Sequence, residues 1–220
     1  MKLYVTPPSP RAFKVIAVMN HLGIEAELAM VDLLNGDQLK PAFLALNPNH
    51  RMPVLEDDGF VLWESNAIMQ YLAAKRPDAG LWPSDPVRQA DVSRWQCWEL
   101  SHWEPACATL LFERFVKQRF GQGDADPAQV ERGERQFHEF AGVLDHHLHG
   151  RDWLVSGGAT LADFSVGCWL TCAGLGQYPL AGYQEIGRWH HRLEALPAWQ
   201  RSLDPSFLHG RNPESGATPH

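Results

Sequence analysis

The feature that most constrains this 220-residue chain is a segment rich in helix- and strand-breaking residues at positions 76–86. Pro77, Gly80, Pro83 and Pro86 fall within it, a composition typical of linkers between domains. Short apolar runs alternate with helical patterns before this segment, whereas only helical patterns follow it. The sequence therefore predicts a mixed α/β domain, a linker and an all-α domain.

The first 75 residues follow the order βαβαββα. Strands are expected at 3–5 and 26–31, and the helix between them makes a βαβ unit, which implies a parallel pair. The turn residues Asp57, Asp58 and Gly59 predict a hairpin. The remaining elements expected in this half are a short helix within 39–46, hairpin strands at 54–56 and 60–62, and a helix over 66–75.

Three helix starts are expected in the second half. Asp85 before Pro86 caps a long helix, and a Pro at position 105 predicts a kink in it. The run 126–129 (DPAQ) predicts a capping box in which Asp126 and Gln129 are reciprocal partners, and 160–163 (TLAD) predicts another before an apolar helix that runs through Cys172. Asp163 is therefore expected to serve folding, with a cap worth about 0.5–2 kcal/mol.

Charge and composition exclude several classes of function. A net charge of −7 and a pI near 5.8, without a Lys/Arg-rich run, argue against nucleic acid as a partner. Prolines in the first ten residues argue against a secretory signal, and no apolar run reaches membrane-spanning length. The four cysteines form no CxxC pair and no ligand set for a metal. A cytoplasmic protein without membrane association, with reduced thiols and no metal site, is expected.

Two motifs carry a resemblance to a known family. Residues 47–55 (NPNHRMPVL) and 63–72 (WESNAIMQYL) closely resemble the NPxxxxPVL and ESxAIxxYL signatures of cytosolic glutathione transferases. Residues 9–15 (SPRAFKV) and 36–40 (GDQLK) are similar to the family's other glutathione-site segments, in the same order, and 160–163 matches a motif of its second domain. The resemblance covers nearly the whole chain.

The resemblance implies a fold and a division into domains. It implies a thioredoxin-like βαβαββα domain that binds glutathione at 1–78, a linker at 79–86, an all-α domain that forms the electrophile pocket at 87–204 and a tail at 205–220. It further implies conjugation of the glutathione thiolate to hydrophobic electrophiles, in a homodimer, with glutathione as co-substrate and no resident cofactor. Isomerisation and dehalogenation use the same site and stay open. The alternative is a noncatalytic binding module of the same fold.

The resemblance assigns both ends of glutathione. A cis peptide bond before Pro53 lets the backbone of Met52 pair with the cysteinyl part as an added strand would. Glu64 and Ser65, at a helix start, take the ammonium and the carboxylate of the γ-glutamyl group. The family's positions for the glycyl end are matched by Gln38, Lys40 and Arg51, and one of the two basic residues is expected to contact the carboxylate.

The resemblance also implies a hydroxyl that holds the sulfur as a thiolate. Ser9, just before Pro10, matches the serine of the serine-type transferases and is also placed to cap a helix. Thr6 stays open as an alternative, whereas Tyr4 lies one residue before the matching position, on the opposite face of its strand.

The second substrate is expected to meet the first helix of the all-α domain. Residues 94–117 hold many aromatic and apolar side chains, an inventory suited to a flat hydrophobic electrophile. Most of these side chains are expected to belong to the core. The candidates for the pocket lining are His102, Trp103 and Ala106.

Overall fold

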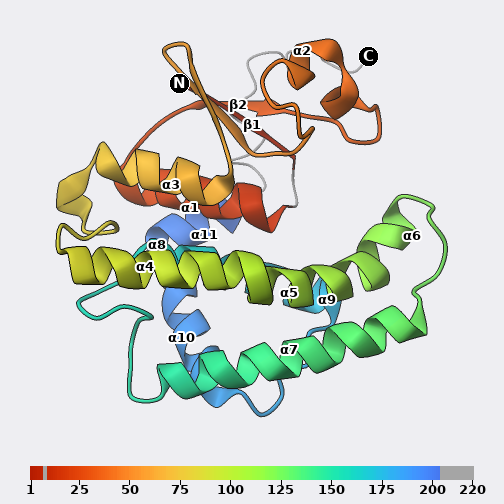
Figure 1. The fold of residues 1–220 in the computed structure, drawn as a ribbon, viewed down its shortest axis with the longest axis vertical. Helices are drawn as coiled ribbons and strands as arrows, with labels where there is room; N and C mark the ends of the chain where they lie inside the picture. Colours follow the sequence, from red (N-terminus) through yellow and green to blue (C-terminus); the bar gives the residue numbers. More distant parts are fainter. Residues whose placement is uncertain (7–8, 204–220) are drawn as a thin grey trace, which may run out of the picture. The chain divides into compact units, whose positions relative to one another are not determined.

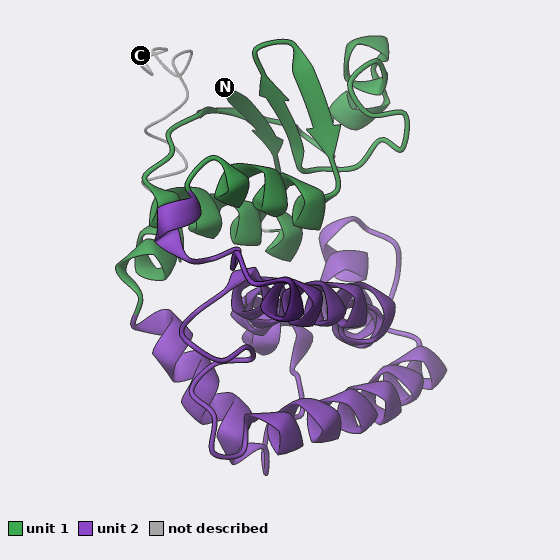
Figure 2. Cartoon of the chain, turned by 60° about the vertical axis from the view of Figure 1, so that its left-hand side comes forward, with its two compact units in different colours: residues 1–76, 196–220 green, residues 77–195 purple. Residues whose placement is uncertain are grey.

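The structure, a computed structural model, describes residues 1–6 and 9–203 (Figure 1). It divides into two compact units (Figure 2). The first, called the N-terminal unit, begins at Met1, ends at Arg76 and resumes at Leu196. The second, called the helical unit, is formed by residues 77–195.

The N-terminal unit contains a four-stranded sheet with the strand order β2-β1-β3-β4. The first two strands in the chain are parallel, whereas β3 is antiparallel to both β1 and β4, so the predicted βαβ unit and hairpin are confirmed. The elements in chain order are β1 (Lys2–Val5), α1 (Pro10–Leu22), β2 (Glu27–Met30), the 3₁₀ turn η1 (Asp37–Leu39), α2 (Pro41–Leu44), β3 (Val54–Asp57), β4 (Phe60–Trp63) and α3 (Ser65–Ala74).

Side-chain alternation along β1 separates the two faces of this sheet. Leu3 and Val5 have no exposed surface, whereas Tyr4 points to the other face, where its ring meets Phe43 of α2 edge to face at 6.1 Å between centroids. Helices α1 and α3 pack against each other on one side of the sheet (Figure 1). The sheet is therefore covered by α1 and α3 on one face and by α2 on the other.

The last described helix, α11 (Pro197–Leu203), belongs to the N-terminal unit. The Trp199 ring packs on Phe13 of α1 at 4.8 Å between centroids, and Asn20 Nδ2 donates to Ser202 Oγ at 2.7 Å. The predicted all-α domain at 87–204 thus differs from the structure at its end, because a helical pattern does not tell which unit its apolar side packs on. The predicted tail, 205–220, lies outside the described residues.

The helical unit is built from the remaining helices, with a continuous helical run from Pro86 to Arg119. A π-helical turn, Glu99–Trp103, lies directly before Pro105. Pro105 has no N–H and crowds the preceding turn, and a wider turn accommodates it at the position of the predicted kink. The elements are η2 (Pro77–Ala79), α4 (Pro86–Trp98), η3 (Glu99–Trp103), α5 (Glu104–Leu111), η4 (Phe112–Val116), α6 (Lys117–Arg119), α7 (Pro127–Leu148), α8 (Leu161–Gly167), η5 (Cys168–Cys172), α9 (Ala173–Gly176) and α10 (Gln184–Glu194).

Helices α4 and α7 begin at the predicted caps. Asp85 Oδ2 accepts from the N–H of Arg88 at 2.8 Å, and Asp126 Oδ1 accepts from the N–H of Ala128 at 2.9 Å. The predicted reciprocal bond from Gln129 is wrong, because the N–H of Asp126 donates to Glu113 Oε2 at 2.7 Å instead. A buried carboxylate from a distant helical turn thus takes the place of the local partner, which no local sequence pattern shows.

The predicted capping box at the start of α8 is confirmed, and its acidic residue, Asp163, also accepts hydrogen bonds from outside the box. Asp163 is fully buried, and its carboxylate accepts from the N–H of Thr160 at 2.8 Å, from the N–H of Leu154 at 2.9 Å and from Trp189 Nε1 at 2.9 Å. Burial raises the pKa of Asp163 to about 6, although these donors oppose the shift. Asp163 therefore joins α8, the preceding loop and α10.

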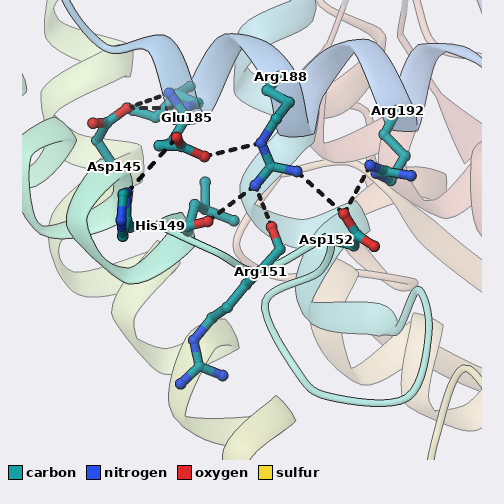
Figure 3. Close-up of polar contacts among 9 residues, drawn as sticks. Asp145, His149, Arg151, Asp152, Glu185, Arg188 and Arg192 are labelled. Atoms are coloured by element: carbon teal, nitrogen blue, oxygen red, sulfur yellow. Dashed lines mark hydrogen bonds and ion pairs between the residues drawn. The ribbon is translucent and has the colours of Figure 1, made fainter.

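Helices α7 and α10 cap each other (Figure 3). Asp145, in the last turns of α7, accepts from the first N–H groups of α10 at Glu185 and Ile186, at 2.9 and 3.0 Å. In return Arg188 of α10 donates to the carbonyl of Leu148, the last residue of α7, and to that of Arg151 in the loop that follows. Arg188 Nη1 and Arg192 Nη2 both donate to Asp152 in the same loop. Each helix end thus finds its partner on the other helix.

Candidate functional site

The strand register brings the predicted glutathione-site segments to one edge of the sheet. Val5 pairs with Met30, Tyr4 pairs with Val54, and Val54 pairs with Trp63. Because β3 is antiparallel to β1, the segments after β1, β2 and β4 and the segment before β3 all leave from this edge. These four segments carry, in turn, Ser9, Gln38, Glu64 with Ser65, and Met52 with Pro53.

Ser9 is the N-cap residue of α1. Its backbone is extended, with φ −124° and ψ 122°, and Pro10 is the first helical residue. Its carbonyl accepts from the N–H of Phe13 at 2.8 Å, whereas its Oγ accepts from the N–H of Ala12 at 3.4 Å, a long bond. A hydroxyl that accepts still has its own proton to donate, so capping leaves Ser9 able to donate to a ligand. Thr6 follows β1 and is half-buried, and Pro7 and Pro8 lie outside the described residues.

The Tyr4 hydroxyl is engaged elsewhere. It donates to Glu56 Oε2 at 3.0 Å, on the face of the sheet covered by α2. Burial, together with the nearby Glu56 carboxylate, raises the pKa of Tyr4. These contacts agree with the expectation that Tyr4 is not the sulfur-binding hydroxyl.

The loop before β3 is held by a buried asparagine. The predicted cis peptide bond between Met52 and Pro53 is present. Asn47 is 2% exposed; its Nδ2 donates to the carbonyl of Arg51 at 2.8 Å, and its Oδ1 accepts from the N–H of Asn49 at 3.0 Å. Asn47 is the first residue of the NPxxxxPVL motif, but the sequence does not predict these two contacts. Its two bonds fix the approach to Met52.

The start of α3 is open and its cap residue is strained. Glu64, the N-cap, has φ 73° and ψ 111°, a conformation that residues with a side chain rarely adopt, and its side chain does not cap the helix. Ser65 is the first helical residue and is 3% exposed. A helix start without a capping side chain or an acid in its first turn favours an anion. The exposed Glu64 carboxylate adjoins it and attracts a cation.

The three residues predicted for the glycyl end differ in their partners. Gln38 Oε1 is buried and has no hydrogen-bond partner among the described residues. Lys40 forms an ion pair with Asp37 Oδ1 at 2.5 Å, which holds the pKa of that carboxyl below its usual range. The Arg51 side chain is exposed and forms no ion pair within the described part of the chain. Arg51 is thus the more available of the two basic residues.

The three predicted pocket residues are not equivalent in the helical unit. Trp103 has no exposed surface: its Nε1 donates to the carbonyl of Val166 at 3.1 Å, and its ring packs on Phe137 at 4.9 Å between centroids. Ala106 has no exposed surface either, so the positions of both argue against a lining role. His102 is exposed, with its ring 5.0 Å from that of Phe140, and stays the one accessible candidate of the three.

Among residues 1–6 and 9–203, no three His, Cys, Asp or Glu side chains are arranged so that they could hold a metal ion. None of the described helices has both the length and the apolar character needed to cross a bilayer.

Comparison with known proteins points to one family. Residues 1–74 match the family model described as glutathione S-transferase, N-terminal domain, and residues 104–197 match the model described as glutathione S-transferase, C-terminal domain. Glutathione S-transferase 3 of Zea mays is 32% identical over 209 residues, 92% of this chain and 93% of that protein. Glutathione S-transferase D7 of Drosophila melanogaster is 29% identical over 207 residues, 93% of this chain and 89% of that protein.

Solved structures of glutathione transferases have the same fold as this chain. A glutathione S-transferase from Pseudomonas fluorescens Pf-5 superposes with a TM-score of 0.83 at 31% identity, over 92% of this chain and 98% of that one. A glutathione transferase from Pseudomonas putida, solved with one glutathione disulfide bound per subunit, gives a TM-score of 0.80 at 27% identity, over 93% and 90% of the two chains. The matches to both domain models and the extent of these similarities lead to one conclusion: the chain belongs to the glutathione S-transferase family.

Proposed function

We propose that this enzyme conjugates the thiolate of glutathione to hydrophobic electrophiles, and that the Ser9 hydroxyl stabilises the thiolate. The observation that carries the proposal is the position of Ser9 at the start of α1, on the sheet edge from which the Met52-Pro53 loop and the open start of α3 also leave. In the reaction the sulfur forms a bond to an electrophilic carbon, which releases a leaving group or takes up a proton. Glutathione is a co-substrate, and no resident cofactor is needed.

Ser9 would act by lowering the pKa of the bound thiol. A free thiol has a pKa of about 8.5, so about 3% is ionised at pH 7, and a decrease of about two units makes most of it thiolate for about 2.7 kcal/mol of preferential stabilisation. A charge-assisted hydrogen bond beside a helix N-terminus has the strength for much of that. The long bond from the N–H of Ala12 does not use the hydroxyl proton.

The rest of glutathione would lie along the same edge. The backbone of Met52 pairs with the cysteinyl part, and the start of α3 at Ser65 receives the γ-glutamyl carboxylate while Glu64 accepts from the ammonium. Arg51 is favoured over the ion-paired Lys40 for the glycyl carboxylate. A peptide N–H of glutathione would satisfy the buried Gln38 Oε1. The bound glutathione disulfide of the Pseudomonas putida relative supports this class of ligand.

The proposal also covers the electrophile pocket, the oligomeric state and the cellular location. His102 is the accessible residue proposed for the electrophile pocket. A cytoplasmic homodimer is proposed from the family resemblance, and the outer strand β4 exposes 49% of Phe60 and 40% of Trp63, apolar surface of the kind that a subunit contact covers. Sedimentation at several protein concentrations tests the dimer.

The decisive experiment is the pH dependence of conjugation of an aryl halide by the Ser9→Ala variant. If the hydroxyl donates to the sulfur, the kinetic pKa of bound glutathione rises by about one to two units, since a charged hydrogen bond is worth about 1.5–3 kcal/mol. The dissociation constant of glutathione, measured by calorimetry, changes little because the other contacts remain.

Thr6→Ala is the matched control, because it removes a hydroxyl from the same loop. A shift in the kinetic pKa of Thr6→Ala but not of Ser9→Ala would move the role to Thr6. If neither variant shifts it, backbone N–H groups and the helix dipole hold the thiolate. A wild-type protein that binds glutathione but conjugates no electrophile would support the noncatalytic alternative.

A further inference from the structure

A buried carboxylate ties the two ends of the β4–α3 segment together. Asp57, at the end of β3, is 7% exposed, and its Oδ2 accepts from the hydroxyl of Tyr71 at 2.7 Å and from Lys75 Nζ. Tyr71 lies in the last turns of α3, and Lys75 directly follows the helix. The Tyr71 ring also packs on Phe60 at 5.4 Å between centroids, and Lys75 Nζ lies 5.1 Å from the Tyr71 ring centroid. Asp57, Tyr71 and Lys75 are called the clamp.

The clamp closes a triangle whose opposite corner is Glu64. Strand β4 leads from the hairpin turn at Asp58-Gly59 to Glu64, and α3 returns from Ser65 to the clamp. Four strand residues and ten helical residues span about 13 Å and about 15 Å, so the two sides have similar lengths. The contact between the two far ends therefore helps to set the angle at Glu64, together with the packing of α3 on α1 and on β4.

Glu64 needs such a constraint. Its φ of 73° is costly for a residue with a side chain, and conformations of this kind persist only where the surroundings enforce them. Its side chain makes no capping bond that would hold the turn locally. The clamp supplies a constraint from the far end, through a charged hydrogen bond between the buried Asp57 carboxylate and the partly exposed Lys75.

We propose that Asp57 is a positioning residue for glutathione, because the clamp holds Glu64 and the start of α3 in the conformation that receives the γ-glutamyl group. The inference rests on the proposed function, in which Glu64 and Ser65 bind that group. Asp57 itself touches no substrate in this assignment. Its effect is on the affinity for glutathione and not on the ionisation of the thiol, which belongs to Ser9 on a different segment.

The test is Asp57→Asn, which keeps the shape of the side chain and removes its charge. The dissociation constant of glutathione should rise about 5- to 10-fold, whereas kcat at saturating glutathione and the kinetic pKa of the thiol stay at the wild-type values. Glu27→Gln is the matched control, because it removes the Lys2–Glu27 ion pair between β1 and β2 in the same unit. The control should leave the affinity for glutathione unchanged.

A double-mutant cycle separates positioning from general loosening. If Asp57 acts through the start of α3, adding Asp57→Asn to Ser65→Ala raises the dissociation constant by less than it does in the wild type. Equal effects in both backgrounds would overturn the proposal. Should Asp57→Asn fail to fold, Tyr71→Phe removes one bond of the clamp and serves in the same cycle, with an expected rise of about 2- to 4-fold.

The outcomes also separate this inference from the proposed function. If Ser65→Ala weakens glutathione binding and Asp57→Asn does not, the positioning role is wrong and the glutathione site stands. If Ser65→Ala leaves the dissociation constant unchanged, the γ-glutamyl assignment itself is wrong, and the positioning role is overturned with it.

Discussion

Helix starts in the two units are treated in opposite ways. In the helical unit α4, α7, α8 and α10 all begin at an Asp carboxylate, supplied by Asp85, Asp126, Asp163 and, from α7, Asp145. In the N-terminal unit α1 begins at the neutral Ser9, and α3 begins at Glu64, whose exposed carboxylate makes no capping bond and leaves the first N–H groups of the helix open. At these four starts the helical unit neutralises its own helix dipoles, whereas the N-terminal unit leaves the starts of its two longest helices, α1 and α3, for an outside anion.

This contrast separates folding from binding with one physical rule. When a carboxylate of the protein itself is bonded to a helix start, it satisfies the free N–H groups there and stabilises the fold. It also repels an anionic ligand from that helix start. A start without one is less stable by itself but selects a thiolate or a carboxylate from solution. Substitutions at the two kinds of helix start should accordingly change different measurements: the free energy of unfolding in the helical unit and the affinity for glutathione in the N-terminal unit.

The largest effect is expected for Asp163→Ala. The substitution leaves buried donors of Leu154, Thr160 and Trp189 without an acceptor, at about 1–3 kcal/mol for each unsatisfied group. We expect the free energy of unfolding to fall by about 3–5 kcal/mol, more than a local cap alone would give. Urea unfolding measures it. Full stability with lost turnover would contradict the structural assignment and break the contrast between the units.

Ser65→Ala is expected to act on binding. The dissociation constant of glutathione should rise about 10- to 150-fold, because hydrogen bonds to a charged group are worth about 1.5–3 kcal/mol. Calorimetric titration measures it. Ser202→Ala is the matched control: it removes another buried serine of the same unit, one that is bonded to Asn20, and should leave the affinity unchanged.

Asp126→Ala is expected to have a smaller effect on stability. The cap is exposed, so we expect a loss of about 1 kcal/mol in the free energy of unfolding and no change in glutathione affinity. Gln129→Ala should be close to neutral, because Glu113 accepts the bond that Gln129 would take in a capping box. If both variants lose a similar amount of the free energy of unfolding, Gln129 does act as the partner of Asp126 in a local capping box.

The smallest effect at neutral pH is expected for Asp57, a buried carboxylate of the N-terminal unit that lies away from the starts of α1 and α3. Lys75, with Tyr71, holds the pKa of Asp57 below its ordinary value of 3.8. A lowered pKa in the folded state stabilises the fold above pH 3.8 and loses that contribution as the pH falls through the folded-state value. The stability difference between wild type and Asp57→Asn should therefore shrink below about pH 4 in acid unfolding experiments and stay constant between pH 5 and 7. A difference that changes between pH 5 and 7 would contradict this assignment.

Local patterns predicted most of the elements and the segments of the site. Turn chemistry gave the hairpin around Asp58 and Gly59, and the Asp-Pro and Thr-Leu-Ala-Asp runs gave the starts of α4 and α8. These features depend on residues close in the chain, so they can be recognised without the fold. The prediction failed where a partner is remote, as for Glu113 at the N–H of Asp126 and for α11, which packs on α1.

By itself the sequence determined the order βαβαββα and the all-helical half, because periodicity and capping are local properties. It also determined which residues carry the family's glutathione motifs, because each motif is a contiguous segment of the chain. Only the tertiary structure decided which of these residues share a sheet edge, since strand register joins segments that are distant in the chain. It also decided that Trp103 and Ala106 are buried while His102 is exposed, and that Asp57 ties α3 to the hairpin. The physical reason is that burial and pairing are set by packing between elements, and a helical or strand period does not encode the partner.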